Sequence, residues 1–158
     1  VCSSDLQAAL EIERIVVHDP ERDVADLGDA AADPAAAVRD ASLIVTATNA
    51  RDPVLRADWV APGAAVLALG ADRRGRRELD YRLLAEAAFV TCDAVGVARA
   101  LADDLRDCVA DGHLDWQEVT PIRDVLAGSA AARVTDDDLV VAKLIDATPL
   151  VLALARLV

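Results

Sequence analysis

The chain has 158 residues, of which 54% are hydrophobic and 3% aromatic. This length is enough for one domain with a hydrophobic core and too short for two substantial domains. The mean hydropathy of +0.28 argues against intrinsic disorder, and no charge-free stretch is long enough to span a membrane. A net charge of −12 disfavours binding to the phosphate backbone of nucleic acids.

Cysteine and histidine usage predicts a reducing, cytoplasmic setting without a metal site. Cys2, Cys92 and Cys108 form no CxxC pair, and His18 and His113 share no metal-ligand spacing with them. The chain contains no methionine and begins without the features of a signal peptide. We therefore expect a preceding segment to be missing, and residues 1–6 to be the translation of a sequencing adapter.

Short apolar runs alternate with stretches of helical character along the chain. This alternation predicts an α/β fold, a parallel sheet with helices on both faces. The predicted strands are residues 14–19, 43–48, 65–70 and 89–93. The predicted helices are residues 34–39, 79–88, 96–110 and 121–126, followed by an apolar helix over 139–158 that is capped by residues 135–138.

An acidic residue ends the first predicted strand. In a dinucleotide-binding fold, the acid that ends the second strand accepts hydrogen bonds from the adenosine ribose, which makes Asp19 a candidate cofactor ligand. The alternative is an acidic turn residue before Pro20. The glycine-rich phosphate loop would precede Asp19 by about 20 residues, at or before the first residue of this chain.

Polar turns follow the next two strands. Thr46, Thr48 and Asn49 could line a cofactor groove, because ligands of open α/β sheets bind at the carboxyl ends of strands, although such a turn can also serve as a simple connection. In the turn formed by Gly70, Ala71 and Asp72, the carboxylate is placed to act as a general acid or base. The alternative is a surface aspartate that pairs with the arginines of residues 73–77.

The fourth predicted strand also ends in an acid. Asp93 precedes a helix, so an N-cap role and a position near the adenine or ribose are both open. The sequence contains no GxSxG motif, Walker loop or HExxH motif.

Taken in chain order, these motifs resemble the pattern of the ornithine cyclodeaminase and mu-crystallin family of NAD(P)-dependent enzymes. The resemblance covers about Ile12 to Leu139. The matching segments are the strand ending in Asp19, residues 41–48 with 53–55, residues 59–63, residues 70–72 with Gly75 and 77–79, and residues 90–93. Each segment is a weak signal alone, and their combination is specific.

The resemblance implies a Rossmann-like domain for NAD, with NADP also possible, incomplete at its N-terminus and covering residues 7–135. It assigns residues 136–158 to a helix of the dimerisation and substrate domain, and it implies a homodimer. Enzymes of this family oxidise an amino acid at its C–N bond or reduce the corresponding imine. Asp72 matches the catalytic aspartate, Asp19 the ribose-binding acid and Thr48 the threonine that lines the cofactor site.

Two departures from the family pattern bear on activity. The family's glycine loop and most of its substrate-carboxylate ligands come from a segment absent here, so we expect this fragment to be inactive by itself. The pattern Phe-Lys-Ser-Val-Gly aligns with residues 142–146, which replace its serine and glycine. A non-catalytic cofactor- and ligand-binding protein of the mu-crystallin kind is therefore the alternative function.

Overall fold

The chain divides into two compact units, Val1–Asp40 and Ala41–Val158, and the computed structural model describes residues 12–145. In the first unit, strand β1 (Val16–Val17) pairs in parallel with β2 (Asp29–Ala30). Helix α2 (Pro34–Val38) lies against β1. The helix begins where the sequence predicts, because the Asp33 carboxylate accepts the N–H of Ala36 at 2.7 Å.

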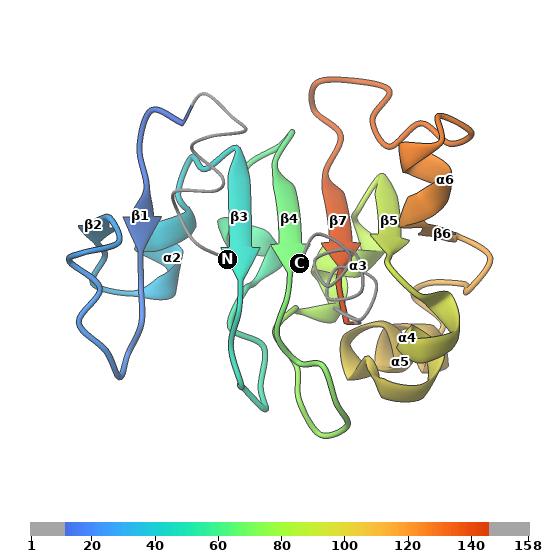
Figure 1. Cartoon of the computed structure of the whole chain (residues 1–158), viewed down its shortest axis with the longest axis horizontal. Coiled ribbons are helices and arrows are strands. Elements are labelled where there is room, and N and C mark those ends of the chain that lie inside the picture. Colours follow the sequence, from blue (N-terminus) through green and yellow to red (C-terminus); the bar gives the residue numbers. More distant parts are fainter. Residues whose placement is uncertain (1–11, 146–158) are drawn as a thin grey trace, which may run out of the picture. The chain divides into compact units, whose positions relative to one another are not determined.

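The second unit is built on a five-stranded parallel sheet in the order β3-β4-β7-β5-β6 (Figure 1). Its strands are β3 (Leu43–Thr46), β4 (Ala65–Ala68), β5 (Phe89–Cys92), β6 (Val119–Pro121) and β7 (Val140–Lys143). Strand β7 comes last in the chain but pairs with both β4 and β5 at the centre of the sheet. All pairings are parallel, so all five carboxyl ends lie at one edge.

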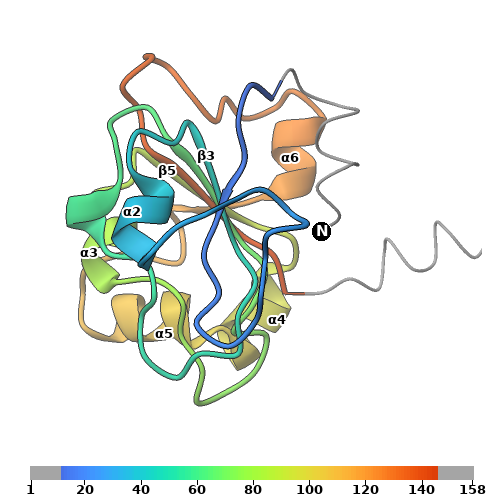
Figure 2. The ribbon, with the colours of Figure 1, turned by 90° about the vertical axis from the view of Figure 1, so that its left-hand side faces the viewer.

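Helices cover the sheet of the second unit, and Figure 2 shows α3 and α6 on opposite sides of its strands. The helical elements are η1 (Ala57–Trp59), α3 (Tyr81–Ala85), α4 (Val95–Leu101), α5 (Asp103–Ala110) and α6 (Ile122–Leu126). The predicted class, a Rossmann-like parallel sheet with helices, is confirmed. Within the described residues, no helix is long and apolar enough to cross a membrane.

One row of β-branched side chains crosses the whole sheet. Ile44, Val66, Val141, Val90 and Val119 are register partners on successive strands, and each is at most 4% exposed. Branched aliphatic side chains pack well on a pleated surface, and strands of a covered parallel sheet are apolar for this reason. The row fixes the register that aligns the strand ends.

The predicted helix from residue 139 onward is wrong where the structure describes it, because Val140–Lys143 is a strand. A short apolar run fits a buried strand as well as a buried helix, and periodicity alone does not separate them. The predicted cap is a turn: the Asp138 carboxylate accepts the N–H of Val134 at 2.8 Å and of Thr135 at 3.0 Å. Residues 146–158 of this prediction lie outside the described residues.

The other differences are smaller. The helix predicted over 96–110 is two helices, separated at the buried Ala102, whose backbone is extended (φ −82°, ψ 93°). Strands β2 and β6 were not predicted because neither Asp29–Ala30 nor Val119–Pro121 is an apolar run. The four predicted strands are confirmed as β1, β3, β4 and β5, with shorter bounds.

We expect Cys92 and Cys108 to resist thiol reagents in the native state. Both side chains are fully buried, and burial raises the pKa of each thiol to about 11, so the reactive thiolate is scarce at neutral pH. A Cys2→Ser variant removes the third thiol. DTNB titration of this variant should give no reaction in native buffer and full reaction of both thiols in urea. Rapid native reaction would contradict the packing described for β5 and α5.

Candidate functional site

The carboxyl ends of the sheet in the second unit bring most of the predicted site residues together. The turn after β3 contacts the turn after β4, because the N–H of Leu69 donates to the Thr46 carbonyl at 2.7 Å and that of Ala71 to the Thr48 carbonyl at 3.3 Å. On the other side, the Asp93 carboxylate after β5 accepts the N–H of Ile145 after β7 at 2.8 Å. Ligands of open α/β sheets bind at this edge.

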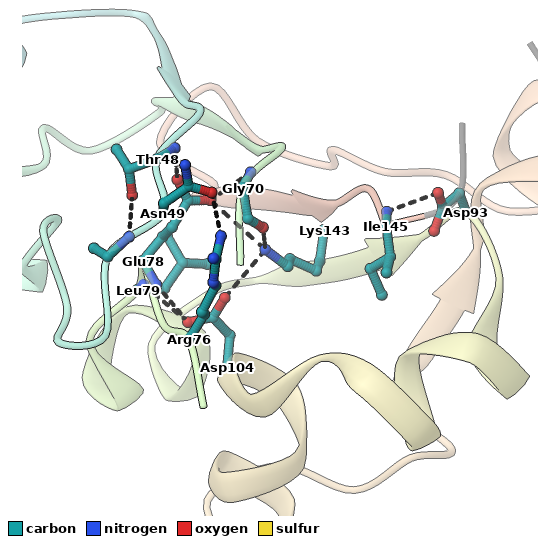
Figure 3. Close-up of polar contacts among 11 residues, drawn as sticks. Thr48, Asn49, Gly70, Arg76, Glu78, Leu79, Asp93, Asp104, Lys143 and Ile145 are labelled. Atoms are coloured by element: carbon teal, nitrogen blue, oxygen red, sulfur yellow. Dashed lines mark hydrogen bonds and ion pairs between the residues drawn. The ribbon is translucent and has the colours of Figure 1, made fainter. Parts of the chain in front are cut away.

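The turn after β3 is held by its own side chains. The hydroxyl of Thr48 accepts the N–H of Ala50 at 3.2 Å, and the exposed Asn49 side chain accepts a hydrogen bond from Arg76 (Figure 3). The hydroxyl of Thr46, at the end of β3, is buried and has no hydrogen-bond partner among the described residues. A buried hydroxyl without a partner is rare and costly, so this atom can serve a ligand.

The turn after β4 is tight. A Cβ added to Gly70 would lie 2.5 Å from the Glu78 carboxylate and closer still to the Thr48 carbonyl, so only glycine fits there. The next residue, Ala71, is 1% exposed and has a φ of +50°, a left-handed conformation that L-residues seldom adopt. Such strain of about 1–3 kcal/mol persists where the surroundings fix the backbone, often at functional sites.

This turn presents Asp72. Its side chain is 45% exposed and pairs with Arg73 at 3.1 Å, which is the arginine contact that the alternative interpretation of Asp72 expects. The hydrogen bond from Arg73 is the main cause that lowers the pKa of Asp72 below its usual value. At neutral pH, Asp72 is therefore an ionised carboxylate that is accessible to solvent.

Three buried charged residues lie beneath these turns and are drawn in Figure 3. Glu78 and Lys143 are 0% exposed and Asp104 is 3% exposed. The Lys143 ammonium lies 3.1 Å from Asp104 and 3.6 Å from Glu78, and it donates to the Gly70 carbonyl. We call Glu78, Asp104 and Lys143 the buried triad.

The two carboxylates of the buried triad accept backbone N–H groups. Glu78 accepts the N–H of Thr48 at 2.6 Å and that of Gly70 at 2.8 Å, with one oxygen for each. Asp104 accepts the N–H of Glu78 at 2.9 Å and that of Leu79 at 3.0 Å. Burial raises the pKa of Asp104, and the adjacent Lys143 ammonium opposes this rise.

The buried triad is not among the site residues that the sequence predicts. One signal was available: Lys143 is the only lysine among 16 basic residues, and it lies within an apolar run. Nothing in the local sequence shows that Glu78 and Asp104 meet it, because the contacts join residues 26 to 73 positions apart.

The arginine-rich loop after Asp72 is fixed by the first turns of α5. The Asp103 carboxylate pairs with Arg74 at 2.7 Å and accepts the N–H of Gly75 at 2.5 Å. One turn further along α5, Asp107 pairs with Arg77. Three of the four arginines of this loop therefore pair with carboxylates of the chain, and Arg76 donates to Asn49 instead.

The two remaining predicted site residues bind backbone in this structure. Asp93 accepts the N–H of Ala94 at 2.8 Å, but the N-cap position of α4 is Ala94, so an N-cap role for Asp93 is wrong. Asp19 accepts the N–H groups of Glu21 at 2.8 Å and Arg22 at 3.2 Å, which forms the acidic turn of the alternative interpretation. Asp19 lies in the first unit, separately from the other candidates.

The model of the ornithine cyclodeaminase/mu-crystallin family matches residues 14–145. The chain belongs to this family. It is 33% identical over 120 residues to the Delta(1)-pyrroline-2-carboxylate reductase of Paracoccus denitrificans, a match that covers 75% of the chain and 37% of that protein.

Solved structures of the family share the fold. A "probable ornithine cyclodeaminase" from Bordetella pertussis superposes with a TM-score of 0.83 at 33% identity, covering 91% of this chain and 49% of that one. An archaeal alanine dehydrogenase dimer with bound NAD gives a TM-score of 0.81 at 25% identity, covering 98% and 54%. The chain thus spans about a third of the length of its curated relatives, for example 37% of the reductase. It spans about half of the length of the solved chains.

We expect Gly70→Ala to destabilise the second unit by about 1–3 kcal/mol, the usual cost of forcing an extra methyl group into packed surroundings. Gly96→Ala is the matched control. A Cβ at Gly96 meets nothing within 4 Å in helix α4, and alanine there should add about 0.5–1 kcal/mol of stability. Urea unfolding measures both variants, and equal midpoints would contradict the close approach of the two turns.

Proposed function

We propose that this chain is the nicotinamide-cofactor part of an NAD(P)-dependent enzyme that acts on the C–N bond of a small amino acid or cyclic imine, as an imine reductase, amino-acid dehydrogenase or cyclodeaminase. Family membership supports this proposal. The observation that carries it is the accessible carboxylate of Asp72 on a strained turn at the carboxyl end of β4, in contact with the Thr48 turn.

Residues of the second unit fit one end of such a cofactor. Thr46 has a buried hydroxyl without a partner at the end of β3, and Thr48, Gly70 and Ala71 form the adjoining turns. These residues, with Asn49 and Asp93, would hold the cofactor. The sequence contains no glycine-rich loop for the pyrophosphate.

When bound, the nicotinamide ring supplies or accepts a hydride. The residues of this chain would orient the ring against the substrate and move protons. Because Arg73 keeps Asp72 ionised, Asp72 begins as a proton acceptor for the substrate amine and returns that proton when the reaction runs toward the amine.

The first unit supports NAD over NADP. Asp19 would accept hydrogen bonds from the ribose hydroxyls and would repel a 2′-phosphate. Arg14 could accommodate such a phosphate, but it pairs with Asp29 at 2.8 Å. Arg22, three residues after Asp19, is the other nearby cation that could accommodate a 2′-phosphate.

The proposal is tested with NADH and a cyclic α-imino acid, using this chain and the complete reading frame of its source gene. We expect the complete protein to quench or shift NADH fluorescence and to oxidise NADH when the imine is added. NADH binding without turnover of any imine or amino acid would favour the non-catalytic binding protein. Absence of NADH and NADPH binding by the complete protein would refute both functions.

A homodimer is part of the proposal, since the archaeal alanine dehydrogenase was solved as a dimer. Light scattering of the complete protein checks it. A monomer with full activity would remove the dimer from the proposal.

We expect Asp72→Asn to lower kcat by about 100-fold or more, the usual contribution of a positioned acid–base group. The affinity for NADH should stay within a factor of about two, because the amide keeps the size of the side chain and affinity scales with contacts retained. Asp52→Asn, in an exposed position after β3, is the control. Steady-state kinetics and NADH titration measure the three proteins, and unchanged turnover in Asp72→Asn would rule out its catalytic role.

A further inference from the structure

The described part of the chain buries its charged side chains in one place only. Glu78, Asp103, Asp104 and Lys143 are its buried charged residues, and all four bind the segment from Gly70 to Leu79. Buried charges are costly, and replacing them with apolar side chains is often neutral or stabilising for a fold. Their concentration beneath one turn therefore calls for a role beyond stability.

We propose that Lys143 is a positioning residue that sets the turns after β3 and β4, and through them the cofactor and Asp72. This inference rests on the proposed function. Lys143 acts directly on one turn, because its ammonium donates to the Gly70 carbonyl. It acts on the other through Glu78, whose two oxygens bind the N–H groups of Thr48 and Gly70.

The charge balance explains why an ammonium is needed. Glu78 and Asp104 place two carboxylates in a region without solvent access, and Lys143 is the cation that faces both. Without it, one carboxylate must take up a proton or the region must open to water. Repulsion between the two buried carboxylates would then displace Glu78 and weaken its contacts with the N–H groups of Thr48 and Gly70.

The position of Lys143 in the sheet makes the arrangement rigid. Lys143 is the last residue of the central strand β7, where it pairs in register with Ala68 of β4 and Cys92 of β5. Its main chain is therefore fixed on both sides, and its side chain reaches the turn that begins two residues after Ala68. Any movement of the Gly70 turn relative to the sheet must break the contact with Lys143.

The test separates positioning from stability with two variants of the complete protein. Lys143→Met removes the cation and leaves two buried carboxylates, so it should lower the melting temperature and weaken function together. Lys143→Met with Asp104→Asn removes one charge of each sign, and the amide introduced at position 104 keeps a carbonyl oxygen that can accept the N–H groups of Glu78 and Leu79. The double variant should regain part of the lost melting temperature, because it leaves one buried carboxylate without a cation instead of two.

Relative to the wild-type protein, we expect the double variant to bind NADH at least about tenfold more weakly and to have a kcat about tenfold lower. A tenfold change corresponds to the free energy of about one hydrogen bond to a charged group. Val119→Ala, in the buried part of edge strand β6, is the control that loses stability and keeps both parameters. Wild-type NADH affinity and kcat in the double variant would overturn the inference and leave Lys143 a structural residue.

A second measurement does not depend on activity. Amide hydrogen exchange of Thr48 and Gly70 in cofactor-free protein should be about tenfold faster in the double variant, because Lys143 no longer holds Glu78, the acceptor of both N–H groups, in place. Unchanged exchange would overturn the inference. If the wild-type protein binds no NADH, the proposed function fails, and the exchange rates still show whether Lys143 fixes the turns.

If both Lys143 variants fail to fold, Glu78→Gln replaces them, because its amide keeps one acceptor for the two N–H groups. It should give the same tenfold losses, and wild-type values would overturn the inference.

Discussion

The contact of the Lys143 ammonium with Glu78, Asp104 and the Gly70 carbonyl is the interaction on which the candidate site depends. It joins the central strand of the sheet to two turns and to the start of α5. The energy of such a buried network is gained only when every polar group is paired, because an unpaired buried charge costs several kcal/mol. Four backbone N–H groups bind the two carboxylates, and the second oxygen of Asp104 is matched by the ion pair with Lys143.

The order of the strands makes this arrangement possible. Strand β7 lies between β4 and β5, although α4, α5, β6 and α6 come between it and β5 in the chain. Parallel pairing then brings the carboxyl ends of all five strands to one edge, where the backbone turns away from the sheet and leaves polar groups for ligands. The row of β-branched side chains from Ile44 to Val119 keeps these ends in register. Apolar packing thus determines where the polar site can form.

The sequence predicted the fold class and four strands because short apolar runs between turn residues are a local signal. It also predicted that Thr48, Gly70 and Asp72 belong to strand ends, and the structure brings their turns together. It missed β7, because the apolar run around Val140 and Val141 fits helix and strand equally. The contacts of Glu78, Asp104 and Lys143 could not be predicted, since they depend on the strand order and on the break between α4 and α5 at Ala102.

The central claim is that the turns after β3 and β4 hold a nicotinamide cofactor above the buried triad. A crystal structure of the complete protein with NADH tests it most directly. We predict that the cofactor lies along the carboxyl ends of the sheet, with its nicotinamide ring beside Thr48 and Asp72 and with a hydrogen bond to the Thr46 hydroxyl. A cofactor bound at the opposite edge of the sheet, or away from both turns, would contradict the account.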